Sequence, residues 1–192
     1  RTRRFADTVG QLAKTDHIDA RTLAKFATTI TPRPSKPVSP SMMALGDLLT
    51  ARRQVVQERA TLLNQLSETS VPLVARQIRA RIKMCARHRD AIETEVRKLI
   101  SECEILRQKF DILTSIPGVA LITAATLLAE LGELGEVTGS QISALVGVAP
   151  MNHDSGASRG KRRIKGGRKN LRKVIYMASL PAINANPDMR RF

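Results

Sequence analysis

Aromatic residues are scarce in this chain of 192 residues, in which they make up 3%, with no tryptophan and one tyrosine. Proteins that hold single-stranded nucleic acid often stack its bases on aromatic side chains, so this composition argues against that mode of binding. The two cysteines, Cys85 and Cys103, form no zinc-binding or disulfide pattern, which fits a reducing cytosol. No apolar run approaches the roughly 18 residues of a membrane-spanning helix, and no signal-like segment begins the sequence. We therefore expect a cytoplasmic protein without a membrane partner.

Acidic residues are also in deficit. The chain has 17 Asp and Glu against 32 Lys and Arg, which gives a formal net charge of +15. Such an excess is the electrostatic signature of a nucleic-acid partner. An anionic membrane surface is an alternative partner, but the helical patterns of this chain lack the lipid-facing amphipathic character that such binding needs.

The densest positive charge lies between Arg159 and Lys173, where no acid occurs. Closely spaced cations displace the condensed counterions of a nucleic acid, and the glycines among them let backbone amides approach phosphates. A solvated basic loop is the alternative. The candidate nucleic-acid contacts are nine cations: Arg159, Lys161, Arg162, Arg163, Lys165, Arg168, Lys169, Arg172 and Lys173.

Strand patterns are absent as well, and apolar residues recur at helical spacing along most of the sequence, so we predict a mainly α-helical protein. Prolines at positions 32, 34, 37 and 40 predict an extended linker over residues 31–41. This linker separates a short helical region, residues 1–30, from long coiled-coil helices over residues 42–113. A helical C-terminal domain is predicted for residues 114–192.

The clearest helical pattern is a heptad repeat within residues 42–113. Its second arm has apolar residues at alternating spacings of four and three, namely Ile92, Val96, Leu99, Cys103, Leu106, Phe110 and Leu113. The first arm is weaker and comprises Leu45, Leu49, Val56, Leu63 and Leu66, with Pro72 predicting the break between the arms. A hairpin within one chain would explain this pattern. The unbroken second arm favours a coiled coil through which copies of the chain associate.

A Pro-Gly turn follows the heptad repeat and precedes another apolar helical pattern. The residues after the proline are Gly118, Val119 and Ala120. This arrangement predicts a helix-hairpin-helix, in which free amides at a helix N-terminus face a DNA phosphate. The usual hairpin has a second glycine where this sequence has Ala120. An ordinary helical turn is the alternative.

Three segments, taken in order, resemble the transposases of insertion-sequence family 110, also called the 110/116/902 group. Residues 12–24 contain Lys-Thr-Asp-His-Ile-Asp-Ala, which is similar to the family's Lys-Thr-Asp-x-x-Asp-Ala element at the end of a RuvC-like, RNase-H-like domain. The second segment is the heptad repeat leading into Ile116-Pro-Gly-Val119. The third is Val146-Gly-Val-Ala-Pro150 with Asp154-Ser-Gly156 and the basic segment. The resemblance implies a remnant of a RuvC-like domain, a coiled coil and a C-terminal transposase domain.

The resemblance implies a DEDD-type recombinase in which four acids bind divalent metal, and Asp16 and Asp19 match the last two of them. Residues three apart lie on one helix face, where two carboxylates can approach a hard cation such as Mg²⁺. Asp16 as a helix N-cap, with Asp19 as the acid three residues later, is the alternative. The family's other two acids belong before Arg1. We therefore expect this chain to be a piece of a longer protein and to be inactive alone.

The resemblance also implies a catalytic serine, and Ser155 matches it because this residue precedes the glycine of the Ser-Gly pair. Adjacent cations would stabilise the transition state of phosphoryl transfer. Candidate bases for the hydroxyl are His153, Asp154 and a metal held by the acids. A serine in a simple turn is the alternative.

The resulting prediction is a transposase or site-specific recombinase that cuts and rejoins DNA through a phosphoserine intermediate. The resemblance further implies DNA substrates, a structured guide RNA, and a dimer or tetramer. The rival hypothesis is a non-catalytic helix-hairpin-helix module that binds DNA or RNA on a coiled-coil dimer.

Overall fold

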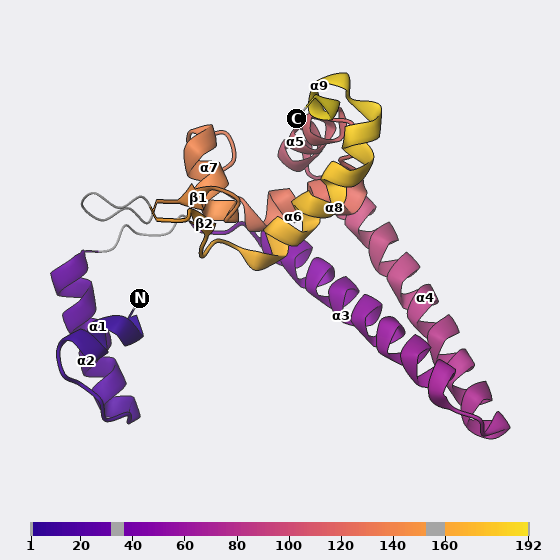
Figure 1. Ribbon diagram of the computed structural model, residues 1–192, viewed down its shortest axis with the longest axis horizontal. Coiled ribbons are helices and arrows are strands. Elements are labelled where there is room, and N and C mark those ends of the chain that lie inside the picture. Colours follow the sequence, from indigo (N-terminus) through magenta and orange to yellow (C-terminus); the bar gives the residue numbers. More distant parts are fainter. Residues whose placement is uncertain (1, 32–36, 153–159, 192) are drawn as a thin grey trace. The chain divides into compact units, whose positions relative to one another are not determined.

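The computed structural model describes residues 2–31, 37–152 and 160–191. The chain divides into two compact units, Arg1–Val38 and Ser39–Phe192, which we call the N-terminal and C-terminal units. Helices dominate both units, as the sequence predicts (Figure 1). Within the described residues, every helix is too short or too polar to cross a membrane.

The N-terminal unit contains helices α1 (Thr2–Thr8) and α2 (Asp16–Ile30). They pack through Phe5 and Phe26, whose rings meet edge to face with centroids 5.5 Å apart. Aromatic pairs prefer this geometry because the positive edge of one ring faces the negative face of the other. Ala6 and Thr22 are buried beside this contact. A core this small explains why most of the surface of α2 is exposed.

A long hairpin of two antiparallel helices, α3 (Pro40–Glu68) and α4 (Pro72–Glu102), begins the C-terminal unit (Figure 1). The hydroxyl of Ser39 accepts from the Met42 amide at 3.3 Å and caps α3. Pro40 is therefore the first residue of the helix, which begins inside the predicted linker over residues 31–41. Proline is well suited to this position because a first-turn amide has no partner within the helix.

The hairpin turns before Pro72, where the sequence predicts a break, and ion pairs join its arms. Arg52 lies 2.8 Å from Glu93, with both side chains mostly buried, and Arg81 lies 3.1 Å from Glu58. The predicted seam of the first arm is partly wrong, because Leu62 is buried where the heptad pattern has Leu63, which is 40% exposed. A straight helix drifts by about 20° per heptad relative to a strict seven-residue repeat, so the buried face shifts by a position along the arm.

The predicted second arm is not one continuous helix. Cys103 has an extended backbone with φ −111° and ψ 107°, and it separates α4 from α5 (Glu104–Thr114). The heptad pattern crosses this break because apolar spacing reports which face is buried rather than whether the backbone continues. Val96, Leu106 and Leu113 of the predicted seam are buried within this chain. The intramolecular hairpin, one of the two alternatives, is therefore what the structure shows.

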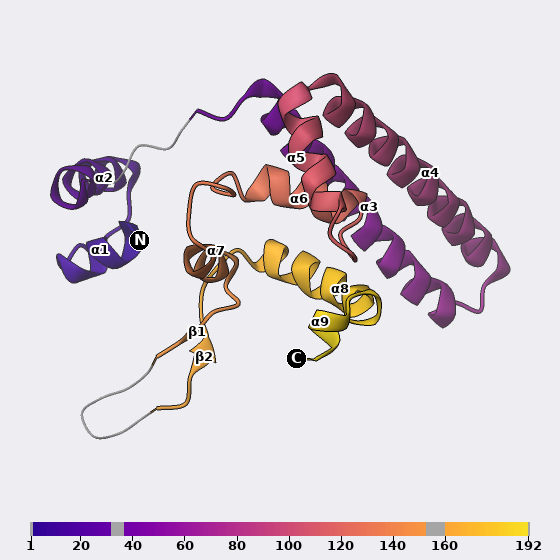
Figure 2. The same ribbon diagram turned by 90° about the horizontal axis from the view of Figure 1, so that it is seen from above.

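The main hydrophobic core lies where the open end of the hairpin meets the C-terminal helices (Figure 2). The helices that contribute are α6 (Leu121–Glu130), α7 (Gly139–Val146) and α8 (Lys169–Ala185). The short helix α9 (Pro187–Arg190) follows α8. The largest fully buried side chains of this core come from α3, α4, α7, α8 and the segment after α6, namely Leu45, Val96, Leu131, Val146 and Leu171. The far part of the hairpin has its own small cluster around Leu62, Ile78 and Cys85.

A short antiparallel ribbon joins β1 (Pro150–Met151) to β2 (Arg163–Ile164), with Pro150 opposite Ile164. The ribbon is a small addition to the predicted, mainly α-helical fold, and the sequence shows no strand pattern at these residues. A strand of two residues is too short to show an alternating pattern, and both of these strands are exposed.

Candidate nucleic-acid interface and catalytic residues

The two acids of the predicted metal site lie in the first turns of α2. The Thr15 hydroxyl accepts from the Ile18 amide at 3.3 Å, so Thr15 is the N-cap. The alternative that made Asp16 the N-cap is therefore wrong, and Asp16 is the first helical residue. Asp19 is half-buried and lines an open cleft with Arg3, Lys14 and Thr22. Both carboxylates are stabilised by the positive end of the helix dipole.

The chemistry of this pair fits part of a magnesium site. Carboxylate oxygens are the ligands that Mg²⁺ takes from proteins, and positions 16 and 19 lie on one helix face. No group of three or more His, Cys, Asp or Glu side chains that could hold a metal occurs within the described residues. Asp16 and Asp19 would therefore need ligands from elsewhere to complete the coordination.

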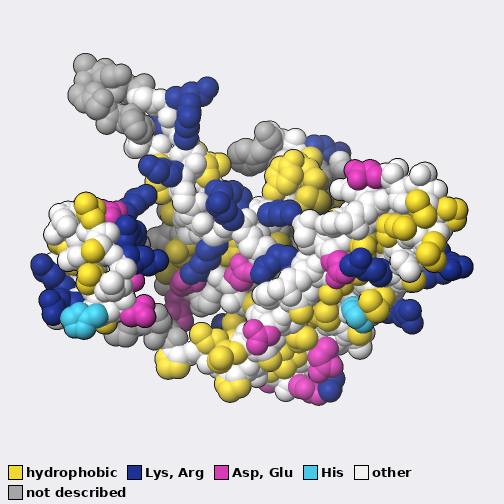
Figure 3. Space-filling model, turned by 90° about the horizontal axis from the view of Figure 1, so that it is seen from below, with side chains coloured by type: hydrophobic (Ala, Val, Ile, Leu, Met, Phe, Trp, Pro, Cys, Tyr) yellow, Lys and Arg dark blue, Asp and Glu magenta, His cyan; other side chains and the backbone are white. Residues whose placement is uncertain are grey.

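The ribbon brackets the segment that carries the predicted serine. Ser155, with His153, Asp154 and Arg159, lies outside the described residues. On the described side of this segment, Lys161, Arg162, Arg163 and Lys165 are all exposed. Dark-blue Lys and Arg side chains extend along this part of the C-terminal unit in Figure 3. The described part of the basic segment thus presents four cations to solvent around β2.

Arg168 has a different environment, because it precedes α8 and faces back into the fold. Its guanidinium donates to the two carboxylate oxygens of Glu133 at 2.5 and 2.8 Å, and to the backbone carbonyl of Glu130 at 2.5 Å. The hydrogen bond and charge of this guanidinium hold the pKa of Glu133 below its usual range. The same hydrogen bond raises the pKa of Arg168. Arg168 therefore joins the loop after α6 to the start of α8.

Arg172 is likewise used within the fold. Its Nη1 donates to the carbonyl of Gly147 at 2.8 Å and to that of Gly166 at 3.3 Å. Lys169 and Lys173 are exposed on α8, and Lys173 lines a groove between α3, α6 and α8. The described members of the nine predicted contacts are therefore of two kinds. Most are exposed cations, whereas Arg168 and Arg172 bind backbone or carboxylate groups of this chain.

The predicted hairpin turn lies between α5 and α6. Gly118 has φ +90°, and the amide of Val119 donates to the carbonyl of Ile116 at 3.0 Å. A Cβ added at Gly118 would lie 2.5 Å from the Ala178 carbonyl oxygen of α8. Glycine is therefore needed for close packing of the turn against α8. Ala120 is exposed and lies directly before the first residue of α6, where amides have no partner within the helix.

Sequence reasoning missed the acids that pair with Arg168 and Asn170. Glu133 lies 35 residues before Arg168, and a carboxylate oxygen of Glu130 accepts from the Asn170 side chain. The available signal was that Glu133 lies in a loop punctuated by glycines and Glu130 lies just before that loop, in a chain with few acids. Arg53 was also missed, although it lines the same groove as Lys173.

Two acids at the start of α2, and an exposed basic ribbon that follows a helical hairpin in the sequence, together fit the transposase class. Residues 110–192 match the model of the family described as Transposase IS116/IS110/IS902. Residues 1–69 match a second model described as Transposase, whose name joins the DEDD acids to the element IS110. The chain belongs to the IS116/IS110/IS902 family of transposases.

Individual relatives agree with this assignment. The chain is 29% identical to the "Insertion element IS110 uncharacterized 43.6 kDa protein" of Streptomyces coelicolor over 106 residues, which is 54% of the chain and 25% of that protein. It is 26% identical to the pilin gene-inverting proteins of Moraxella bovis and Moraxella lacunata, with 98% of the chain and 59% of each relative covered. The chain thus spans less than two thirds of the length of each of these relatives.

Proposed function

We propose that the whole protein is a DNA transposase that cuts and rejoins strands with Ser155 as nucleophile. The observation that carries this proposal is the joint match of both ends of the chain to transposases, one containing Asp16 and Asp19 and the other Ser155. The Moraxella relatives are named for inverting a pilin gene. Inverting a segment requires strands to be cut and joined to new ends.

The chemistry we propose begins with attack of the Ser155 hydroxyl oxygen on a backbone phosphorus. A phosphoserine ester forms, the phosphorus–oxygen bond to one deoxyribose oxygen breaks, and that oxygen takes a proton from the protonated base and leaves as a hydroxyl. The proton lost by the serine passes to a base, for which His153 and Asp154 are candidates by their position in the sequence. Attack by the hydroxyl of another strand then reverses these steps and releases the serine.

Charge on the phosphate grows as the phosphorus becomes five-coordinate, and cations near the reacting atoms stabilise that state. Lys161 and the neighbouring exposed cations of the ribbon follow Ser155 closely in the sequence, which suits them to this role. Asp16 and Asp19 would hold part of a Mg²⁺ site, and the metal would stabilise charge on phosphate oxygens when bound.

We also propose that the protein binds duplex DNA, uses a structured RNA as a guide and associates with itself. The net charge of +15 supports partners with phosphate backbones. Self-association needs a surface other than the buried seam. Val71, Leu73 and Val74 at the far end of the hairpin are 39 to 54% exposed and offer an apolar surface to a second copy.

The deciding experiment compares Ser155→Ala with Ser158→Ala in the full-length chain, supplied with its DNA and RNA. Ser155→Ala should reduce strand cleavage by at least about a thousandfold and remove any covalent protein–DNA adduct, with DNA binding unchanged. Ser158→Ala should retain cleavage. Cleavage that survives both Ser155→Ala and Asp16→Ala with Asp19→Ala would overturn the assignment of these residues. A full-length chain that binds DNA but never cuts it would instead support the non-catalytic binding module.

A further inference from the structure

Helix α4 carries a row of exposed cations on a face next to its buried face. Arg76, Arg79, Lys83 and Arg87 follow one another at spacings of three, four and four residues, so they lie on one face of the helix. All four are exposed. The buried residues of the same part of α4 are Ala75, Ile78 and Cys85, which lie on a neighbouring face of the helix. We call the four cations the α4 stripe.

The stripe differs from the other arginines of α4 in its partners. Arg81 pairs with Glu58 at 3.1 Å, and Arg89 pairs with Asp90 at 2.6 Å. Among the described residues, no ion pair to a carboxylate is found for any member of the stripe. The sequence from Thr69 to Arg89 contains six Lys and Arg and no Asp or Glu. The positive charge of the stripe is therefore not neutralised locally.

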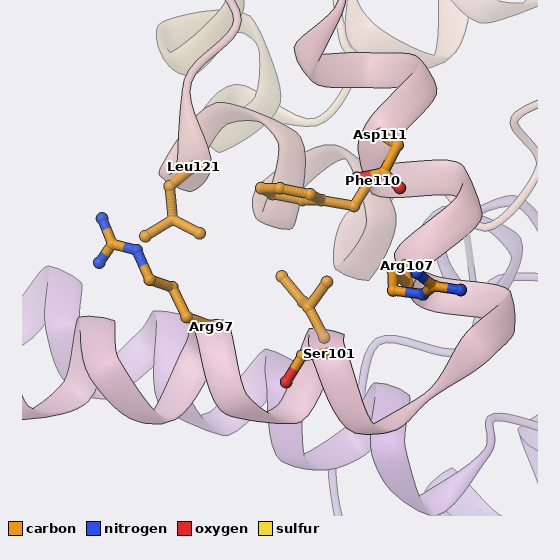
Figure 4. A pocket seen from close by; sticks show the side chains of 7 residues that line it. Arg97, Ser101, Arg107, Phe110, Asp111 and Leu121 are labelled. Carbon is orange, nitrogen blue, oxygen red and sulfur yellow. The ribbon is translucent and has the colours of Figure 1, made fainter.

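Continued along α4, the line of the stripe leads to Arg97, near the turn at Gly118 that precedes α6. Arg97 lies 21 positions after Arg76, so the distance from the first cation of the stripe to Arg97 is about 32 Å at 1.5 Å per residue. Asp90, which pairs with Arg89, lies between Arg87 and Arg97 on this face. Arg97 is exposed and lines a cavity with Ser101, Phe110 and Leu121. Figure 4 shows its guanidinium on the same side of this cavity as Leu121, the first residue of α6. A cation thus stands beside the helix N-terminus predicted to face a phosphate.

We propose that the α4 stripe and Arg97 bind the backbone of duplex DNA. This duplex would contact the turn at Gly118 and continue along α4, which is the outer arm of the α3–α4 hairpin. In Figure 2 α4 is the outer arm, and α6 and α8 lie on the side of α3. A row of about 32 Å matches one turn of duplex, which is about 34 to 36 Å long. The row has no aromatic side chain, so it suits phosphates rather than unstacked bases. This inference rests on the proposed function, which makes DNA the substrate.

The test uses two double variants of the 192-residue chain with the same loss of charge on the same helix. Arg79→Gln with Lys83→Gln removes half of the stripe, whereas Arg81→Gln with Arg89→Gln removes two cations that are already paired. Glutamine is a good helix former, so both variants should keep the helix content and melting temperature of the parent. The probe is a labelled duplex of about 30 base pairs, which is about three turns.

The stripe variant should make the negative slope of log affinity against log salt shallower by about two units. Its affinity at roughly 0.1 M salt should fall by about tenfold or more, and the paired-arginine variant should lose less than one unit of slope. Equal effects of the two variants would overturn the inference, because only total charge would then matter. A loss confined to an RNA hairpin of equal length would also overturn it, since the occupant would be RNA.

Failure of this inference is distinct from failure of the proposed function. Strand cleavage that requires Ser155, together with equal slopes for the two variants, would remove only the α4 contact. A stripe-dependent slope without Ser155-dependent cleavage would leave the DNA contact and remove the nucleophile assignment.

Discussion

The guanidinium of Arg168 and the carboxylate of Glu133 form a bidentate ion pair, with donor–acceptor distances of 2.5 and 2.8 Å. Both side chains are 37% exposed, so solvent screens the pair and its net contribution to stability is about 1 kcal/mol or less. Its position matters more than its strength. It joins the loop after α6 to the start of α8, which begins at Lys169 within the basic segment.

Glu133→Gln should therefore lower the melting temperature by a few degrees at pH 7. The pKa of Glu133 is lowered in the folded chain, so the ion pair's stabilisation is fully present above the carboxylate's unfolded pKa of about 4.3. It is lost as the pH falls below that value through the lower pKa of the folded state. Thermal melts from pH 7 to 3 should show a constant difference between parent and variant that shrinks below about pH 4.5. A difference that grows toward acid would contradict the pairing.

Gly118→Ala should destabilise the C-terminal unit by about 1 to 3 kcal/mol. The new Cβ would meet the Ala178 carbonyl oxygen at 2.5 Å, and φ +90° is strained for any residue with a side chain. Gly46→Ala is the control, because Gly46 lies inside α3 with open space around its Cα. That variant should gain about 0.5 to 1 kcal/mol from helix propensity. Urea unfolding of both variants measures the contrast.

Replacement of Arg162, Arg163 and Lys165 by glutamine should flatten the salt dependence of duplex binding by about three units. These cations are exposed around β2, and each lost phosphate contact removes about one unit of slope. Melting temperature should not change, since none of the three is buried. Anisotropy titrations at several salt concentrations provide the slopes. An unchanged slope would place the main DNA contacts away from the ribbon.

Self-association should depend on the far end of the hairpin. Val71→Ser with Leu73→Ser should shift the chain from a larger species to a monomer in sedimentation experiments, because both side chains are more than half exposed. Val96→Ser would not be informative, because this buried residue supports the fold itself. A parent chain that stays monomeric at tens of micromolar would contradict this prediction.

Local chemistry made part of the fold predictable. Proline at position 72 cannot continue a helix, and the hairpin turns immediately before it. The apolar pattern around Leu45 and Val96 likewise identified residues of the core. Such features depend on neighbours in the sequence or on one helix face, so they can be recognised without coordinates.

Other features depend on residues far apart in the chain. The role of Arg168 follows from an acid 35 residues away, and nothing in the basic segment separates this arginine from the exposed ones. The break at Cys103 leaves the apolar spacing intact, so a heptad pattern alone cannot reveal it. The acids and the serine were assigned by family resemblance, and the described residues add the N-cap at Thr15 and the basic surface beside the ribbon.

Two glycines close the stretch of chain that contains the ribbon. A Cβ added at Gly167 would lie 2.3 Å from the Cα of Gly147, so the backbone after α7 and the backbone before α8 touch directly. Residues 148–166 are therefore inserted at a single point of the helical scaffold. Because the scaffold meets itself at this point, a change in the length or sequence of the insertion should leave the packing of the helical core intact.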